Sequence, residues 1–137
     1  MVDFFEEDLK FINNESKYWE FIRCLRNDKR VKHGFIKQNY ISEDIHLKFM
    51  EKYGNMFYIC LYKNKPAGYI GCINKDIRVA VHPDFQGNGI GSFMVNKLME
   101  LDSEAFAKVK LDNKASLRLF EKCGFEKKYY ILEKDAP

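Results

Sequence analysis

The sequence contains little that would break it into separate units. Its 137 residues include only three prolines, and no internal repeat or low-complexity tract interrupts them. This is the length of one ordinary domain, so we expect residues 1–137 to form a single domain. Hydrophobic residues make up 46% of the chain, including 12 Phe and 8 Tyr, which is enough apolar surface for a folded core. Intrinsic disorder is therefore excluded.

The chain also lacks a long apolar run and a strong excess of one charge. No stretch approaches the roughly 20 apolar residues that cross a bilayer, and residues 1–11 are acidic where a secretory signal would be basic. The net charge of +3 is too small for a dedicated nucleic-acid binder, although it suits a small anionic ligand. We therefore expect a cytoplasmic protein whose partners include no nucleic acid and no membrane.

Metal-binding and disulfide patterns are absent as well. The four cysteines form no CxxC pair, and the three histidines lie far from them in sequence. Cys60 and Cys72 fall on neighbouring predicted strands. A turn at Asn64-Lys65 would place Cys60 opposite Tyr69 and leave the two sulfurs roughly 10 Å out of register. We expect reduced thiols and no metal site.

Two helices are predicted in the amino-terminal part of the chain, over residues 16–26 and 42–52. Apolar residues recur at helical spacing over residues 16–26, with Ser16 placed as the N-cap. Residues 42–52 repeat the pattern, with Ser42 as the cap and Gly54 as the stop. The apolar stripe of this second helix is predicted to consist of Ile45, Phe49 and Tyr53.

Short β-rich runs follow and then alternate with helices. The runs at residues 57–63, 67–73 and 76–81 are separated by two turns and predict an antiparallel meander. The elements expected after it are a helix over residues 89–101, a short strand over 108–111, a helix over 115–122 stopped by Gly124, and a strand or hairpin half over 125–133. This order predicts a layered α+β, or mixed α/β, architecture.

The most informative stretch joins the last strand of the meander to the next helix through three alternating glycines, Gly87, Gly89 and Gly91. Glycines let the chain turn tightly and let backbone N–H groups approach a ligand closely. The first turn of the following helix adds unpaired donors and the positive end of the helix dipole. The junction therefore predicts a binding site for an anion such as a diphosphate.

Two well-known phosphate loops do not fit this stretch. The dinucleotide pattern GxGxxG requires a third glycine where Ser92 stands, and the spacing from strand to glycine is longer than that motif allows. A Walker loop requires Gly-Lys followed by Ser or Thr, and that triplet does not occur in the chain. Dinucleotide binding and ATP hydrolysis are both disfavoured.

The pattern QxxGxG over residues 86–91 resembles the acetyl-coenzyme A loop of the GNAT superfamily of N-acetyltransferases. The lead-in VAVHPDF before it and the stretch NKASLRLFEKCGF over residues 113–125 resemble two further parts of the family pattern. The resemblance covers residues 77–125. It implies the acyl-CoA N-acyltransferase fold, a mostly antiparallel twisted sheet that is splayed at the coenzyme site and flanked by helices.

The resemblance also implies where acetyl-CoA, the cosubstrate, would lie. It would enter a V-shaped gap between the strand at 76–81 and the strand at 108–111, with the pantetheine amides on the first strand and the pyrophosphate on the glycine loop. The residues expected to contact it are Val79, Ala80 and Val81 on the strand, Gln86, Gly87, Asn88, Gly89, Ile90, Gly91 and Ser92 in the loop, and Asn113 and Ser116 further on. For Asn113 a plain N-cap is an equal alternative. His82 and Asp84 are interpreted as residues that stabilise the loop.

A backbone N–H of the strand would stabilise the oxyanion while the amine attacks directly, with no covalent acetyl-enzyme. Cys123 is therefore interpreted as a packing residue. Many family members carry a tyrosine where this chain has Phe120, so the acid that protonates the thiolate would have to be water or another hydroxyl. The hydroxyls considered for that role are those of Tyr129, Tyr130 and Ser116. The candidate bases are His46, Glu43, Glu51 and Asp76, and His46 leads because it titrates near neutrality.

The amino-terminal half is expected to choose the acceptor amine. Residues 21–28 and 41–49 resemble segments of GNAT enzymes that acetylate amino groups on sugars or sugar nucleotides. Donors and acceptors suited to hydroxyls and a phosphate are supplied there by Arg26, Asn27, Asp28 and Arg30. Two alternatives stay open: an acceptor such as a protein N-terminus, a lysine or another small amine, or a module that binds acyl-CoA without turnover. The sequence also leaves open whether the domain forms a homodimer.

Overall fold

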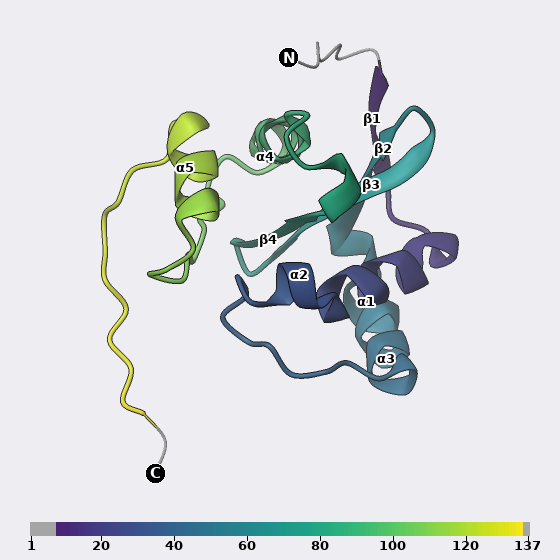
Figure 1. Cartoon of the computed structure of the whole chain (residues 1–137), viewed down its shortest axis with the longest axis horizontal. Coiled ribbons are helices and arrows are strands. Elements are labelled where there is room, and N and C mark those ends of the chain that lie inside the picture. Colours follow the sequence, from purple (N-terminus) through teal and green to yellow (C-terminus); the bar gives the residue numbers. More distant parts are fainter. Residues whose placement is uncertain (1–7, 136–137) are drawn as a thin grey trace.

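The structure, a computed structural model, describes residues 8–135 and has a four-stranded antiparallel sheet at its centre (Figure 1). The strands are β1 (Leu9–Asn13), β2 (Phe57–Tyr62), β3 (Lys65–Ile73) and β4 (Asp76–Val81), and they lie in the sheet in this order. The acidic residues 1–7, on which the argument against a secretory signal partly rests, lie outside the described residues. Within the described part, no helix is both long and apolar enough to cross a bilayer.

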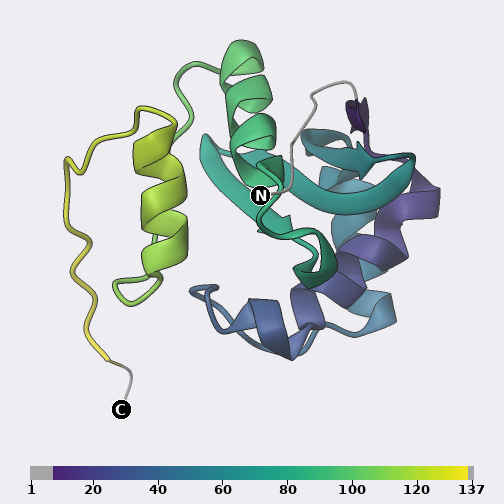
Figure 2. The ribbon, with the colours of Figure 1, turned by 45° about the horizontal axis from the view of Figure 1, so that its top comes forward.

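Helices cover both faces of the sheet (Figure 2). The elements on one face are α1 (Trp19–Asn27), α2 (Lys29–Lys32) and α3 (Glu43–Tyr53), and those on the other are α4 (Ile90–Leu101) and α5 (Lys114–Lys122). The buried apolar residues form two clusters accordingly. One joins the sheet to α4 and α5 around Met94 and Val95, and the other joins it to α1 and α3 around Ile22 and Met50. The predicted α+β class is confirmed.

The predicted meander is confirmed, but its first hairpin has a different register. Its two-residue turn is Lys63-Asn64, both with positive φ, rather than Asn64-Lys65. A β-bulge between Cys60 and Leu61 then places Cys60 opposite Gly68, not Tyr69. Counting from the observed turn would pair Cys60 with Ala67, and the one extra residue of the bulge moves the partner to Gly68.

Strand β1 was not predicted. It is a short edge strand whose residues pair with β2 from Leu9↔Tyr62 to Asn13↔Tyr58, and Phe11 stacks on Tyr58 with ring centroids 4.9 Å apart. Five residues with a charged side chain at the second position, Lys10, carry too little alternation to be recognised by pattern. Pairing with β2 is what makes this segment a strand.

Helix α3 begins as predicted but turns a different side chain inward. The Ser42 side chain accepts a hydrogen bond from the Ile45 backbone N–H at 3.3 Å, which confirms the cap. The predicted stripe is confirmed at Phe49 and Tyr53, which pack against the core, and is wrong at Ile45, which is 64% exposed. The most buried residues of the helix are His46 and Met50, each 2% exposed. Gly54 has φ of −57° and passes into a 3-10 turn (Gly54–Met56) instead of stopping the chain in the left-handed region.

The start of the first helix also differs from the prediction. A 3-10 turn (Ser16–Tyr18) precedes α1, and no side chain caps either element, so the cap assigned to Ser16 is wrong. By contrast, α4 and α5 begin within one residue of their predicted starts, and Gly124 ends α5 with φ of +92°.

The two strands expected near the carboxyl end are not formed. Residues 107–111 make no ladder, and residues 125–135 run as an extended segment without a hydrogen-bonded strand partner among the described residues (Figure 1). Tyr129 and Tyr130 on that segment are 91% and 90% exposed. A β-prone sequence becomes a strand only where an edge is free to pair with it.

Candidate active site

The loop from β4 to α4 is held in shape by its own side chains. Pro83 opens a 3-10 turn (Pro83–Phe85), and the Nδ1 atom of His82 accepts a hydrogen bond from the Asp84 backbone N–H at 3.1 Å. The side-chain amide of Gln86 donates to the carbonyl of Val81 at 3.2 Å. The predicted role of His82 as a loop-stabilising residue is confirmed. The Phe85 and Gln86 N–H groups donate to the His82 and Pro83 carbonyls, so the first part of the loop uses its own donors.

The next residues leave a run of backbone donors without partners. Gly87 and Gly89 adopt φ of +86° and +75°, and Gly89 is the N-cap of α4 with no side chain capping it. Among residues 8–135 no acceptor bonds the N–H groups of residues 87–92; the first engaged one is that of Phe93, which donates to the Gly89 carbonyl at 3.0 Å. Asn88 contributes by donating its side-chain amide to the Phe85 carbonyl at 2.9 Å.

These free N–H groups fit an anion. They lie at the amino end of a 12-residue helix, where the dipole is positive, and they come from residues that are exposed or half-buried except Ile90. A left-handed backbone turns consecutive N–H groups toward one side, as in other anion-binding turns. The donor set therefore suits the two phosphoryl groups of a diphosphate.

Gly91 has a different reason to be glycine. A Cβ built on it would stand 3.2 Å from both terminal methyl groups of Leu119, so its absence lets α5 approach α4 closely. Cys123 packs in the same interface, with its sulfur 4.0 Å from the Ser92 carbonyl, and burial raises the pKa of its thiol. A thiol with a raised pKa is a poor nucleophile, which agrees with the packing role expected for Cys123.

Strand β4 offers an unpaired edge. The His82 N–H donates to the Ala67 carbonyl at 2.8 Å, and alternation along an antiparallel pair then directs the backbone groups of Ala80 toward β3. Those of Val79 and Val81 point to the opposite edge. Of the three residues expected to contact the coenzyme, Val79 and Val81 therefore present backbone groups outward. Ala80 is 6% exposed and its backbone groups are bonded within the sheet.

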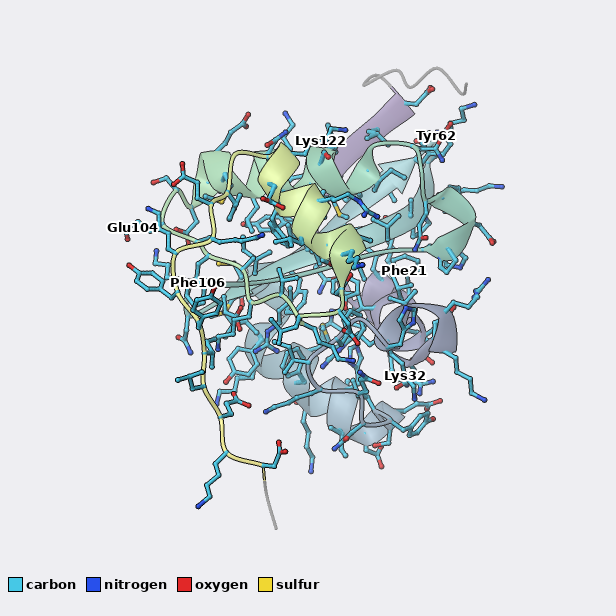
Figure 3. The ribbon with its side chains drawn as sticks, turned by 60° about the vertical axis from the view of Figure 1, so that its left-hand side comes forward. Phe21, Lys32, Tyr62, Glu104, Phe106 and Lys122 are labelled. Carbon is cyan, nitrogen blue, oxygen red and sulfur yellow. The ribbon has the colours of Figure 1, made fainter. Side chains whose placement is uncertain are left out.

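The segment that follows α4 touches β4 at one end only. The Phe106 N–H donates to the Lys75 carbonyl at 2.7 Å, and the Ile77 N–H donates to the Phe106 carbonyl at 2.9 Å, forming one parallel bridge. Beyond it, no backbone hydrogen bond links residues 78–81 to residues 107–111 within the described chain. Figure 3 brings this side forward, with Phe106 at the left margin and α5, ending at Lys122, in front.

Contacts with the turn after α2 hold the diverging segment away from β4. Lys110 donates from Nζ to the His33 carbonyl, and Asn113 donates from Nδ2 to the Gly34 carbonyl, each at 3.1 Å. Residues 33–34 and 112–115 line a hollow of about 290 Å³. The predicted V-shaped divergence is present, although the segment opposite β4 is not a strand.

Asn113 has both ends of its side chain engaged. Its Oδ1 accepts a hydrogen bond from the Ser116 backbone N–H at 3.0 Å and caps α5, while its Nδ2 holds Gly34. The cap, one of the two roles weighed for Asn113, is confirmed. The Ser116 N–H is consumed by the same cap, so neither group is free for a ligand in this arrangement.

His46, the leading candidate base, lies inside the layer formed by α1 and α3. It is 2% exposed, its Nε2 is 2.9 Å from the Trp19 carbonyl, and its Nδ1 is buried without a partner. Burial lowers the pKa of this imidazole. A ring enclosed in this way cannot contact an incoming amine unless α1 and α3 part, so its placement does not support the expected catalytic role.

The other expected proton-transfer residues are scattered. Glu43 is 78% exposed and lies 3.6 Å from Arg23, and Glu51 lines a separate hollow of about 540 Å³ beside Trp19. Asp76 begins β4 with its side chain 23% exposed, 3.9 Å from Lys108. Of the candidate bases, Asp76 is therefore the one on the strand with the open edge.

Phe120 is a buried packing residue. It is 5% exposed and packs edge-on against Phe125 with ring centroids 5.1 Å apart. The hydroxyls of Tyr129 and Tyr130 lie on the exposed extended segment. None of these residues is positioned to deliver a proton to the gap in this conformation.

Most of the polar side chains expected to bind the acceptor already form hydrogen bonds with other residues of the protein. Asn27 exchanges hydrogen bonds with the Ile41 backbone at 2.8 and 2.9 Å. Arg30 pairs with Asp28 at 2.7 Å. Arg26 has no such partner. The sequence analysis missed Arg78, the one charged side chain in the interior of β4, which projects toward the same α1 and α3 face.

A family model for "Acetyltransferase (GNAT) family" matches residues 11–125 of this chain. A curated relative, an N-acetyltransferase of Methanocaldococcus jannaschii described as uncharacterized, is 28% identical over 92 residues. That match covers 55% of this chain and 41% of the relative, so the chain spans less than half the length of this curated relative.

Solved structures share the fold at low identity. A spermidine N-acetyltransferase from Vibrio cholerae, in complex with CoA and spermine, is 18% identical and has a TM-score of 0.76, covering 93% of this chain and 86% of that one. A domain from Methanocaldococcus jannaschii, also 18% identical, has a TM-score of 0.78 and coverages of 88% and 89%. The microcin C7 self-immunity acetyltransferase MccE, in complex with acetyl-CoA and AMP, is 23% identical with a TM-score of 0.66, covering 87% and 79%.

Proposed function

This chain belongs to the GNAT family of acetyltransferases, and from that premise we propose that it transfers the acetyl group of acetyl-CoA to a primary amine by direct attack. One observation carries the proposal: the run of unpartnered backbone N–H groups at residues 87–92 lies next to an open strand edge. The first feature suits a diphosphate and the second suits an extended amide-containing chain. Coenzyme A contains both parts.

The loop would hold the pyrophosphate through the N–H groups of residues 87–92. The outward Val79 carbonyl and Val81 N–H would pair with the pantetheine amides as an added strand does. The Val81 carbonyl is taken by Gln86, so only its N–H is left for this purpose. The acyl end of the extended arm would then lie beside the Val79 N–H, just before the place where Phe106 closes the gap at Ile77.

The Val79 N–H is the oxyanion donor in this proposal. It points to the open edge, whereas the Ile77 N–H on the same edge is already bonded to the Phe106 carbonyl. A preorganised donor aimed at the oxygen that gains charge contributes more to the rate than one that must reorient. Acetyl-CoA supplies the activated thioester, and the chain supplies position and this hydrogen bond.

Proton transfer in this proposal uses water and Asp76. An amine that arrives as ammonium must lose a proton, and Asp76 is the partly exposed carboxylate on β4. The departing thiol has a pKa near 8.5, so it leaves as a thiolate that water protonates without a positioned acid at Phe120. His46 supports α1 and α3 rather than the reacting groups.

The acceptor was expected to be an amino sugar or sugar nucleotide. That finer expectation rests on residues 26–30, of which Asp28 and Arg30 bond to each other and Asn27 bonds to the Ile41 backbone. The acceptor proposed here is therefore a small amine, with an amino sugar as one member of that class. The polyamine bound to the Vibrio cholerae relative is another.

Binding without turnover is the second candidate function, favoured by the buried His46 and by Phe120. Two measurements separate it from catalysis. At a hundredfold excess over its dissociation constant, acetyl-CoA should stabilise the chain by about 2.7 kcal/mol, while NAD and ATP at equal concentration should add little. Release of free thiol with a panel of amines then indicates turnover. Stabilisation by NAD alone would refute the proposal, and stabilisation by acetyl-CoA with no thiol release would support the binding module.

A further inference from the structure

Two arginines meet on the face of the sheet opposite the glycine loop. Arg26 on α1 and Arg78 on β4 both lie over the ring of Phe49 on α3, with guanidinium carbons 5.0 and 5.9 Å from the ring centroid. The three residues, here called the arginine cluster, come from three different elements. Only the tertiary fold brings them together.

Neither guanidinium of the arginine cluster is neutralised. In the part of the chain that the structure describes, no carboxylate lies within 4.0 Å of Arg26 or Arg78, and neither side chain makes a hydrogen bond, whereas Arg23 and Arg30 each have both. Burial lowers the pKa of Arg26, and the charge of Arg78 lowers it further. Burial raises the pKa of Tyr69 on β3 to about 12, and both arginines oppose that rise, which shows that their charges act on one spot.

Two neighbouring cations without a counter-ion are unfavourable unless a ligand pairs with them. The Arg26 guanidinium is partly buried and loses hydration, whereas Arg78 is exposed. A carboxylate or phosphate can pair with both through charge-assisted hydrogen bonds in a planar fork. Phe49 holds both groups by cation–π contact and leaves their N–H edges free. The cluster is thus arranged as a receptor for an anionic group.

The position of Arg78 relates this receptor to the reaction. It directly precedes Val79, the proposed oxyanion donor, and strand alternation directs its side chain to the face opposite that of Val79. Val79 packs in the cluster formed with α4 and α5, whereas Arg78 is exposed on the side of α1 and α3, so in this proposal the amine approaches the acyl end from the side of the arginine cluster.

We infer that the acceptor amine of this chain also carries a carboxylate or phosphate group, which Arg26 and Arg78 bind. This inference rests on the proposed function and narrows it. A purely cationic acceptor such as spermidine is repelled by the same pair, so the acceptor class differs from the polyamine of the Vibrio cholerae relative.

Matched acceptors test the inference directly. Tyrosine against tyramine compares a carboxylate with its absence, glucosamine 6-phosphate against glucosamine does the same for a phosphate, and spermidine is the cationic probe. We expect kcat/KM to be about ten- to a hundredfold higher for the anionic member of at least one pair. The pair that responds distinguishes the carboxylate from the phosphate. Equal values within both pairs, or the highest value for spermidine, would overturn the inference while leaving acetyl transfer intact.

Variants locate the effect. Arg26→Gln and Arg78→Gln should raise KM for the anionic acceptor about tenfold or more and leave the neutral acceptor unchanged, and Arg78→Lys should recover part of the loss. Lys48→Gln, which removes an exposed charge from α3 next to Phe49 in sequence, is the matched control and should change neither. An equal rise in KM for both acceptors would show a merely structural role.

A binding readout covers the case in which no acceptor is turned over. With the loop saturated by coenzyme A, inorganic phosphate should raise the unfolding temperature of the parent chain and not that of the Arg26→Gln, Arg78→Gln double variant. No phosphate effect on the parent, or the same effect on both, overturns the inference. Failure of coenzyme A itself to bind would instead refute the proposed function.

Discussion

The two ligand sites proposed on the two faces of the sheet are built from different groups. On the side of α4, the site is made of backbone N–H groups at residues 87–92 and along the edge of β4. On the side of α1 and α3, it is made of side chains, chiefly Arg26, Arg78 and Phe49. A backbone site needs glycine and a helix start but few particular side chains. The opposite face can therefore change its acceptor through a few substitutions while the coenzyme loop stays intact.

The largest effect that tests this comparison is expected at Gly89. Changing Gly89→Val should weaken acetyl-CoA binding more than a hundredfold, on the order of 3 kcal/mol, because a β-branched residue does not adopt φ of +75° and its Cβ points where N–H groups must meet the ligand. Calorimetric titration measures it. Gly124→Val is the matched control, with φ of +92° at the end of α5, and should lose stability without losing affinity. Equal affinity in parent and Gly89→Val would show that the loop does not hold the coenzyme.

An intermediate effect is expected at His46, where a substitution should lower stability without changing coenzyme binding on the other face of the sheet. His46→Gln should lower the free energy of unfolding by about 1–3 kcal/mol, because it disturbs the buried hydrogen bond to the Trp19 carbonyl. Chemical denaturation measures the change. Acetyl-CoA affinity and turnover per folded molecule should stay nearly unchanged. A large fall in turnover with stability intact would restore His46 as the base.

The same residue predicts a pH dependence. Burial holds the pKa of His46 below its usual 6.5, so the unfolded chain binds this proton more readily than the folded one. Its contribution to stability is complete above pH 6.5 and declines as the pH falls below that value toward the lower pKa of the folded state. Between pH 7.5 and pH 5.5 the parent should lose more stability than His46→Gln. Identical pH profiles would contradict a buried neutral ring.

The smallest effect is expected at Asn113. Asn113→Ala removes the cap of α5 and the bond to Gly34 and should cost about 1 kcal/mol of stability. Asn113→Asp keeps the capping oxygen and loses only the donor, so it should cost less. Thermal unfolding with and without acetyl-CoA compares them. A loss of coenzyme affinity larger than the loss of stability would assign Asn113 to the ligand instead of to the helix.

Much of the coenzyme side was predictable because its signals are local. The left-handed glycines, the start of α4 and the stop at Gly124 each depend on residues a few positions apart, and the structure confirms them. The errors fall where partners are distant. Edge strand β1 needs β2, the expected strands at 108–111 and 125–133 do not pair with the open edge of β4, and the bulge after Cys60 shifts a register that no local pattern records.

The sequence alone determined the glycine loop from β4 to α4, since φ of glycine and the unpaired N–H groups of a helix start are properties of a short stretch of chain. It also determined the family, through two motifs in order. The tertiary structure decided that His46 faces inward, that Asn113 serves a helix, and that Arg26 and Arg78 share one aromatic ring. The physical reason is that a helix or strand can be rotated or shifted by one residue at little local cost, and only packing against other elements fixes which side chains meet.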